Sequence, residues 1–177
     1  LNPVKENSKT YKHFNNLTCM ENTLVLVKPE GVKRHLIGKI IQRFEDAGLK
    51  IIGMKQVWVD NEFSKQHYSE HVGKAFYESL EKYITEGPVI AIVLQGVNAV
   101  ENVRKVVGES EPKSSPPGTI RGDFAHMSFQ HADSKGNPLK NLIHASGNLE
   151  EAKKEISLWF KDYELHSYKT MQDYFLE

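Results

Sequence analysis

The order in which short apolar runs alternate with amphipathic stretches limits the possible folds of this chain more than any other sequence feature. The apolar runs contain β-branched residues and are bordered by turn residues, as β-strands are. The amphipathic stretches repeat their apolar residues at helical spacing. We expect strands at 23–27, 49–59, 89–94, 124–129 and 142–143, and helices at 36–47, 62–69, 76–85, 99–107 and 149–160.

This order contains a β-α-β-β-α-β frame. Such a frame is typical of the α+β class, and in particular of a ferredoxin-like antiparallel sheet backed by helices. Segment 125–140 is polar and contains a Gly-Asn-Pro turn, so we expect an extended hairpin insertion there. A chain of 177 residues is most simply one domain. We interpret residues 1–19, which are polar, as a disordered extension or a remnant added for expression, with the domain at 20–177.

The composition argues against several classes of protein. The 23 basic and 23 acidic residues balance, so no overall field attracts nucleic acid or a membrane. The basic residues also alternate with acidic ones, as at 150–155, so nucleic acid is not expected as a main partner. No run approaches the ~18 apolar residues of a membrane span, and residues 1–19 lack the apolar core of a secretory signal. The single cysteine, Cys19, fits a reducing compartment, so we expect a cytoplasmic protein.

Glu155 lies on the apolar face of the helix predicted at 149–160, in register with Ala152. A carboxylate buried there needs a polar partner. His144 lies upstream, at the end of an apolar run, and can be that partner. A carboxylate beside an imidazole fixes one tautomer and raises its nucleophilicity. The pair suggests nucleophilic catalysis, although lone His and Glu residues at such spacing are also common as structural groups.

Three cationic side chains lie where a ligand could meet them, and each also has an ordinary interpretation. Lys28 follows the strand at 23–27, where it points into a pocket or lies at a surface turn. Arg104 falls in a valine stripe, where it covers apolar surface or turns into a cleft toward an anion. Arg121 lies between two glycines that allow close approach to a ligand, or forms a solvated pair with Asp123. Cations, a histidine and a buried glutamate together suit phosphoryl transfer, which depends on positioning and charge stabilisation.

The usual signatures of nucleotide-binding folds are missing. The sequence has no Walker motif and no kinase-type glycine-rich loop. His126 and His131 have no cysteine pair beside them, so we expect no structural metal site. Tyr68 and Phe76 are candidates for stacking on a base. Phe76 is also in register with Leu80, and on periodicity alone a core position is its better interpretation.

Three segments of the chain resemble the signatures of the nucleoside diphosphate kinase family. These segments are VKPEGV at 27–32, GTIRGDF at 118–124 and NLIHAS at 141–146. Their order and spacing match the family too, as does the intervening Arg104, and the resemblance extends over about residues 21–160. It implies a ping-pong enzyme that moves the γ-phosphoryl group from a nucleoside triphosphate, such as ATP, to a nucleoside diphosphate.

The resemblance also implies a role for each candidate residue. His144 would be the phosphorylated nucleophile, Glu155 would hold its other ring nitrogen, and Ser146 would support that carboxylate. Mg²⁺ would bridge the phosphates and be held mainly by them, and the protein would be a homo-oligomer, either a dimer, a tetramer or a hexamer. The nucleotide contacts would be Lys28, Arg104, Ser110 and Arg121 at the phosphates, Lys28 and Asn141 at the ribose, Phe76 and Leu80 at the base, and Tyr68 close to the histidine.

The chain departs from the family pattern in four places. Glu30 replaces the usual aspartate, Ser110 the usual threonine, and Ala145 the common glycine. Segment 125–140 is longer than in the pattern, and it could alter subunit packing or cover the nucleotide. The alternative to an active kinase is a regulatory module that binds nucleotides without turnover, since a fold does not guarantee a function. Such a module would typically lack the histidine or an arginine, and this chain has both.

Overall fold

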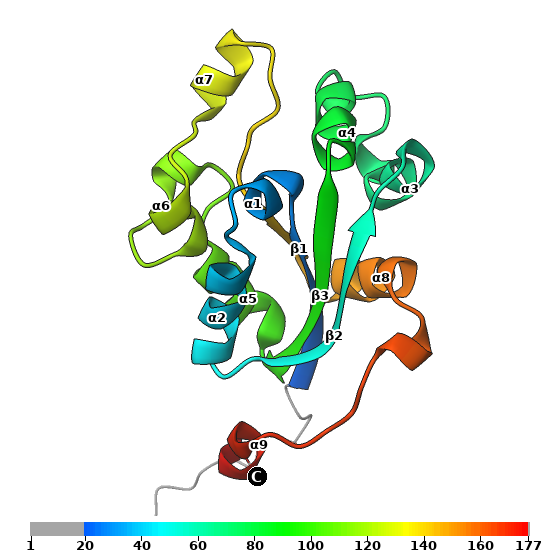
Figure 1. Cartoon of the computed structure of the whole chain (residues 1–177), viewed down its shortest axis with the longest axis vertical. Helices are drawn as coiled ribbons and strands as arrows, with labels where there is room; N and C mark the ends of the chain where they lie inside the picture. Colours follow the sequence, from blue (N-terminus) through cyan, green and yellow to red (C-terminus); the bar gives the residue numbers. More distant parts are fainter. Residues whose placement is uncertain (1–19, 177) are drawn as a thin grey trace, which may run out of the picture.

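A computed structural model describes residues 20–176, which form a four-stranded antiparallel sheet covered by helices (Figure 1). The predicted α+β class and ferredoxin-like arrangement are confirmed. The extension predicted at 1–19 lies outside the described residues. The strand order is β2-β3-β1-β4, with β1 at Met20–Val27, β2 at Lys50–Trp58, β3 at Pro88–Val97 and β4 at Ile143–Ala145.

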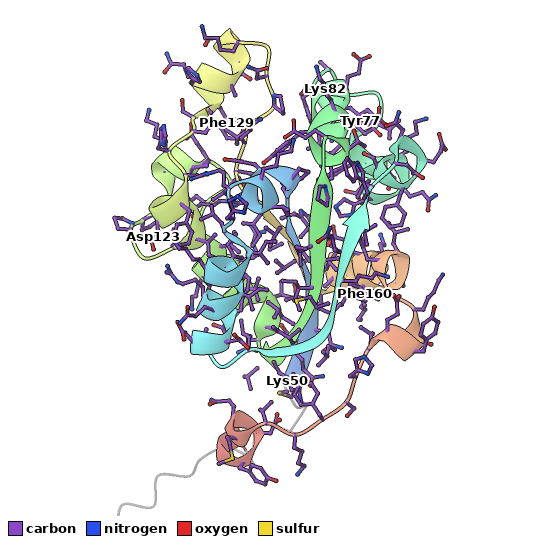
Figure 2. The ribbon with its side chains drawn as sticks, viewed as in Figure 1. Lys50, Tyr77, Lys82, Asp123, Phe129 and Phe160 are labelled. Carbon is purple, nitrogen blue, oxygen red and sulfur yellow. The ribbon has the colours of Figure 1, made fainter. Side chains whose placement is uncertain are left out.

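Side chains fill the space between the sheet and the helices on both faces (Figure 2). Successive residues of a strand point to opposite faces, so Val25 and Val27 pack into one cluster and Leu24 and Leu26 into the other. Burial on both faces explains why β3 is almost continuously apolar. The first cluster includes residues of α2 (Ile37–Asp46) and α5 (Ala99–Val107), and the second includes residues of α4 (Tyr77–Thr85) and α8 (Leu149–Trp159), with α3 (Asn61–His67) against α4 and α8.

The predictions for segment 124–140 are wrong in conformation, because it forms neither a strand nor a hairpin. Phe124 ends the short helix α6 (Ile120–Phe124), and a second helix, α7 (Phe129–Ser134), rises at the edge of the molecule (Figure 1). Ser128 caps α7 by accepting a hydrogen bond from the His131 backbone N–H. The Gly-Asn-Pro turn does reverse the chain, but it follows a helix, since the Asn137 N–H donates to the Ala132 carbonyl.

Short helices also occur after β1 and in the tail. The residues after β1 form a short helix, α1 (Pro29–Lys33). The tail contains the 3-10 helix η3 (Asp162–Glu164) and the helix α9 (Met171–Leu176). It runs along β2, to which the His166 N–H donates a hydrogen bond at the Ile52 carbonyl. Within residues 20–176, no helix combines the length and apolar character that crossing a membrane requires.

Candidate active site

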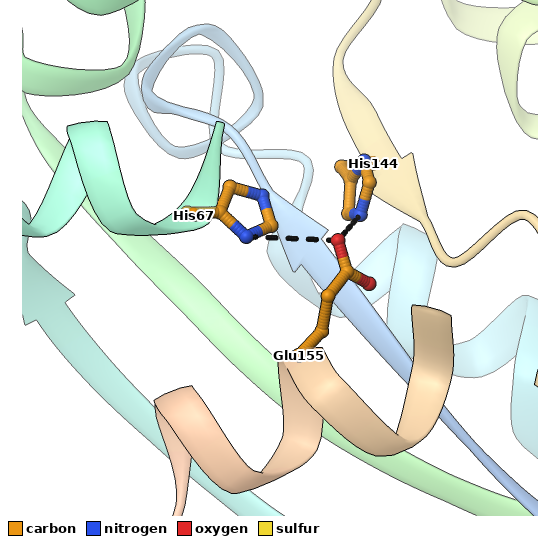
Figure 3. A group of neighbouring side chains, drawn as sticks. All are labelled: His67, His144 and Glu155. Atoms are coloured by element: carbon orange, nitrogen blue, oxygen red, sulfur yellow. Dashed lines mark hydrogen bonds and ion pairs between the residues drawn. The ribbon is translucent and has the colours of Figure 1, made fainter. Parts of the chain in front are cut away.

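The predicted pair of His144 and Glu155 is in contact. His144 comes from β4 and Glu155 from the buried face of α8, and His144 Nε2 lies 2.7 Å from Glu155 Oε1 (Figure 3). Ser146 Oγ donates a 2.5 Å hydrogen bond to the other carboxylate oxygen. Because an ionised carboxylate only accepts hydrogen bonds, the proton lies on Nε2 of His144. His144 Nδ1 therefore keeps its lone pair.

The surroundings keep the imidazole of His144 neutral. Burial, with the positive charges of Lys28, Arg121 and Arg104 adding to it, lowers the pKa of His144 to about 3. Burial also raises the pKa of Glu155, while the Ser146 hydroxyl acts in the opposite direction. A neutral imidazole with one nitrogen held by a carboxylate has the properties of a nucleophile over the whole physiological pH range.

Lys28 lies inside the site, so its interpretation as a surface lysine is wrong. Its side chain points inward from the end of β1, and the residue is only 6% exposed. Its Nζ donates a 2.8 Å hydrogen bond to Asn141 Oδ1, and the Asn141 amide donates in turn to the Ser110 carbonyl. Burial and the nearby Arg121 lower the pKa of Lys28 to about 7. Lys28 and Asn141 thus form one polar unit, as expected if both reach the same ligand.

Arg121 is buried and does not pair with Asp123, which instead forms an ion pair with Arg43. The Arg121 guanidinium donates to four backbone carbonyls, those of Gly108, Glu109, Asn141 and Ile143, at 2.6 to 3.1 Å. Burial and the charge of Arg104 lower its pKa to about 10, at which the group remains a cation. Since a guanidinium has five N–H donors, one remains for a ligand.

The backbone just before His144 is held in an unusual conformation. Leu142 has a φ of 66°, and the Ile143 N–H donates to the Asn141 carbonyl, two residues back, at 2.7 Å. This γ-turn is a rare and strained conformation for a residue with a side chain. Two of the carbonyls that Arg121 binds, those of Asn141 and Ile143, flank the turn. Arg121 therefore stabilises the turn that presents His144.

A cavity of about 360 Å³ brings most of the predicted nucleotide-binding residues together. Phe76 is 51% exposed at the start of α4, so the core position that periodicity favours is wrong for this residue. Leu80, one turn later, is half-buried, as expected for a side chain that forms part of the cavity wall. The predicted residues that line this cavity are Lys28, Tyr68, Phe76, Leu80, Ser110, Asn141 and His144.

Arg104 does not line this cavity. It is exposed on α5 and borders a wider neighbouring cavity of about 900 Å³. Its charge is still close enough to lower the pKa values of His144 and Arg121. A phosphate contact for Arg104 stays a prediction.

One residue of the site, His67, was not predicted from the sequence. Its Nδ1 lies 3.6 Å from Glu155 Oε1 (Figure 3). The same nitrogen accepts a hydrogen bond from the Trp159 indole. Burial and the neighbouring His144 lower its pKa to about 3, so His67 is neutral. No spacing in the sequence links α3 to β4 and α8, so only the fold could bring this histidine to the pair.

Among the described residues, His67, His144 and Glu155 are the side chains that lie close enough together to hold a metal ion. Their ligand atoms lie within 4.8 Å of one another. The hydrogen bonds from His144, Ser146 and Trp159 already use those atoms, however. These atoms therefore already have hydrogen-bond partners within the protein.

The fold and site together define a ferredoxin-like α+β protein with a carboxylate-supported histidine in a cavity that also contains Lys28. The family model for nucleoside diphosphate kinase matches residues 21–165. The nucleoside diphosphate kinase of Pyrococcus furiosus is 49% identical over 156 residues, which cover 88% of this chain and 92% of that protein. The chain belongs to the nucleoside diphosphate kinase family.

Solved structures lead to the same family. A nucleoside diphosphate kinase from Borrelia burgdorferi, described as a transition state mimic with bound vanadate and ADP, superposes with a TM-score of 0.85. It is 44% identical, and the match covers 88% of this chain and 95% of that one. A halophilic nucleoside diphosphate kinase from Halobacterium salinarum, in complex with CDP, has a TM-score of 0.78 and is 39% identical over 89% of this chain and 98% of that one.

Proposed function

We propose that this chain transfers the γ-phosphoryl group of a nucleoside triphosphate to a nucleoside diphosphate through a phosphohistidine on His144. The observation that carries this proposal is the bond between His144 Nε2 and Glu155, which leaves Nδ1 free for attack beside a cavity that Lys28 also lines. The ADP, vanadate and CDP bound to the two structural relatives support a nucleotide as the ligand.

In the first half-reaction, the Nδ1 lone pair of His144 attacks the γ-phosphorus. The N–P bond forms as the bond between phosphorus and the β,γ-bridging oxygen breaks, and the nucleoside diphosphate leaves with that electron pair. The Nε2 proton stays in place, and the Glu155 carboxylate stabilises the positive charge that develops on the ring. In the second half-reaction, a terminal oxygen of an incoming diphosphate attacks the same phosphorus, the N–P bond breaks, and its electron pair returns to Nδ1, which restores neutral His144.

The residues around the cavity would bind the nucleotide in three parts. Lys28 and the free N–H of Arg121 would contact the phosphates, with the Ser110 hydroxyl and Arg104 at their outer side. Asn141 and Lys28 would reach the ribose. Phe76 would stack on the base beside Leu80. Tyr68, whose hydroxyl is buried with no hydrogen-bond partner among the described residues, would face the phosphoryl group.

The donor groups of the cavity fit an ion that arrives with the nucleotide. The described lining offers the Lys28 ammonium, amides and hydroxyls, and Asp133 is its one carboxylate. Mg²⁺ commonly binds through substrate phosphates together with one or two carboxylates, so the phosphates would be its main ligands here. When bound, Mg²⁺ would neutralise charge on the transferring group. A homo-oligomer and a cytoplasmic location are part of the same proposal, the second on the basis of the single cysteine.

Initial-rate kinetics test the proposal. With ATP varied at several fixed concentrations of GDP, double-reciprocal plots should be parallel, because the first product leaves before the acceptor binds. His144→Ala should bind ATP and show no turnover, while His126→Ala, a change at an exposed loop histidine, should match the native protein. Intersecting lines, or turnover by His144→Ala, would overturn the phosphohistidine route. ATP binding without turnover in the native protein would instead establish the regulatory module.

A further inference from the structure

The helix α7 supplies part of the nucleotide cavity. Figure 1 shows α7 and α4 rising on opposite sides of the same end of the sheet. The cavity that contains His144 has Phe76 and Leu80 of the α4 region on its lining, and also Phe129, Ala132 and Asn137 of the α7 region. The inserted segment therefore reaches the site, although it contributes no residue to the phosphohistidine chemistry.

Phe129 is an exposed aromatic residue in a fixed position. It is 49% exposed at the first turn of α7, whereas Ala132 is buried. Its backbone N–H donates a 2.9 Å hydrogen bond to Glu111, whose carboxylate also accepts from Ser114. The Lys113 N–H donates to the Met127 carbonyl two residues before Phe129. These contacts tie the start of α7 to the 3-10 helix η2 (Pro112–Ser114) and fix the backbone that carries the Phe129 ring.

Two half-exposed phenylalanines on one cavity suggest a slot for a flat ring. Leaving Phe76 and Phe129 in water costs free energy that burial against an apolar face would recover. A planar π-system between two aromatic rings makes contact through both of its faces. A nucleobase is such a ligand, and the cavity that we assign to the nucleotide is lined by both phenylalanines.

We propose that Phe129 forms the second face of the base-binding slot, so that a nucleobase is held between Phe76 and Phe129 and covered by α7. This inference rests on the proposed nucleotide-binding function of the cavity. Segment 125–140 could either cover the nucleotide or alter subunit packing, and this inference assigns it the first role. It also gives this slot a preference for purines, because a larger ring system covers more of both phenylalanines.

The test uses donors with and without a base. Labelling of the enzyme by γ-labelled ATP, CTP and ribose 5′-triphosphate is measured against donor concentration. Phe129→Ala should raise the half-saturating ATP concentration about tenfold, in line with the loss of one stacking face. The half-saturating CTP concentration should rise by a smaller factor. The half-saturating concentration of ribose triphosphate and the maximal labelling rate should not change. Phe129→Tyr should restore the native half-saturating ATP concentration. Tyr163→Ala is the matched control and should behave like the native protein, because the Tyr163 ring is 82% exposed on η3 and does not line the cavity.

An unchanged ATP saturation in Phe129→Ala would overturn the proposal. So would an equal rise for ribose triphosphate, since the ring would then act on something other than the base. A change of oligomer size by light scattering with normal ATP saturation would assign α7 to a subunit contact instead. Failure of the proposed function itself looks different, because no donor would then label the native protein at all.

Discussion

The Nη2 group of Arg121 donates a 2.6 Å hydrogen bond to the carbonyl of Ile143, the residue directly before the proposed nucleophile. With its bond to the Asn141 carbonyl, this contact holds both ends of the γ-turn at Leu142. Arg121 fixes the backbone that presents His144, and in the proposed function it has a second task, since its remaining N–H would bind a phosphate.

These two tasks predict that Arg121→Lys loses nearly as much stability and activity as Arg121→Ala. An ammonium carries the charge but cannot reach four carbonyls in the fork geometry of a guanidinium. We expect the unfolding free energy to fall by about 3 kcal/mol and the labelling rate to fall ~10²-fold, as measured by urea denaturation and rapid quench. Arg43→Lys, in a surface ion pair, should change stability by less than ~1 kcal/mol. A lysine variant with native stability would remove the backbone role.

The carboxylate of Glu155 should matter through its charge as well as its position. Glu155→Gln keeps the shape of the side chain but loses the charge that stabilises the ring during attack. We expect the maximal labelling rate to fall ~10²-fold with little change in ATP binding, measured by calorimetry. Ser146→Ala leaves the charge in place and should cost less, about tenfold. Equal losses in the two variants would contradict this ranking.

The imidazole of His144 should stay neutral at low pH. Because burial and the nearby cations lower its pKa to about 3, its ring resonances should not titrate between pH 8 and 5 in the unliganded protein. A histidine at the ordinary pKa of 6.5 would be almost fully protonated at pH 5. Nitrogen-15 NMR of the ring, assigned with His144→Ala, measures this directly. Observation of a doubly protonated His144 near pH 6 would contradict the electrostatic description of the site.

Lys28 should make the stability of the unliganded protein depend on pH. Its pKa is about 7 when folded, below the ordinary lysine value of 10.5. Between these values the unfolded chain binds the proton and the folded protein does not, so the unfolding free energy rises with pH. From pH 7 to 9 the contribution is about 2 kcal/mol. Lys28→Met should reduce the rise of the unfolding free energy between pH 7 and 9 by this amount, and an identical rise would show that Lys28 is charged when folded.

Hydrophobic periodicity was sufficient to predict the core of the fold. The apolar stripes of α2, α5 and α8 are long enough to show a helical period, and they placed Glu155 on a buried face as the structure has it. The six residues of α7 are too few to show a period, and the signal that was available, Ser128 as an N-cap, was hidden by the turn that follows. Phe76 matched the period of α4 but is the N-cap residue directly before the helix, and its ring is 51% exposed.

The residues of the site likewise include some that the sequence could predict and some that it could not. His144, Ser146 and Glu155 could be predicted together, because a carboxylate on an apolar face demands a partner and the motif supplied one. The contact of His67 with Glu155 joins elements that are distant in sequence, and the backbone clamp of Arg121 depends on where four carbonyls fall. Such contacts follow from tertiary packing and have no local sequence signal.

The most direct measurement is incubation of the native protein with Mg²⁺ and γ-labelled ATP in the absence of an acceptor, followed by denaturing electrophoresis. The proposed mechanism predicts a label that is stable to alkali, labile to acid, absent from His144→Ala and discharged by added GDP. If native protein that binds ATP remains unlabelled, or if His144→Ala is labelled equally, His144 is not the phosphoryl carrier.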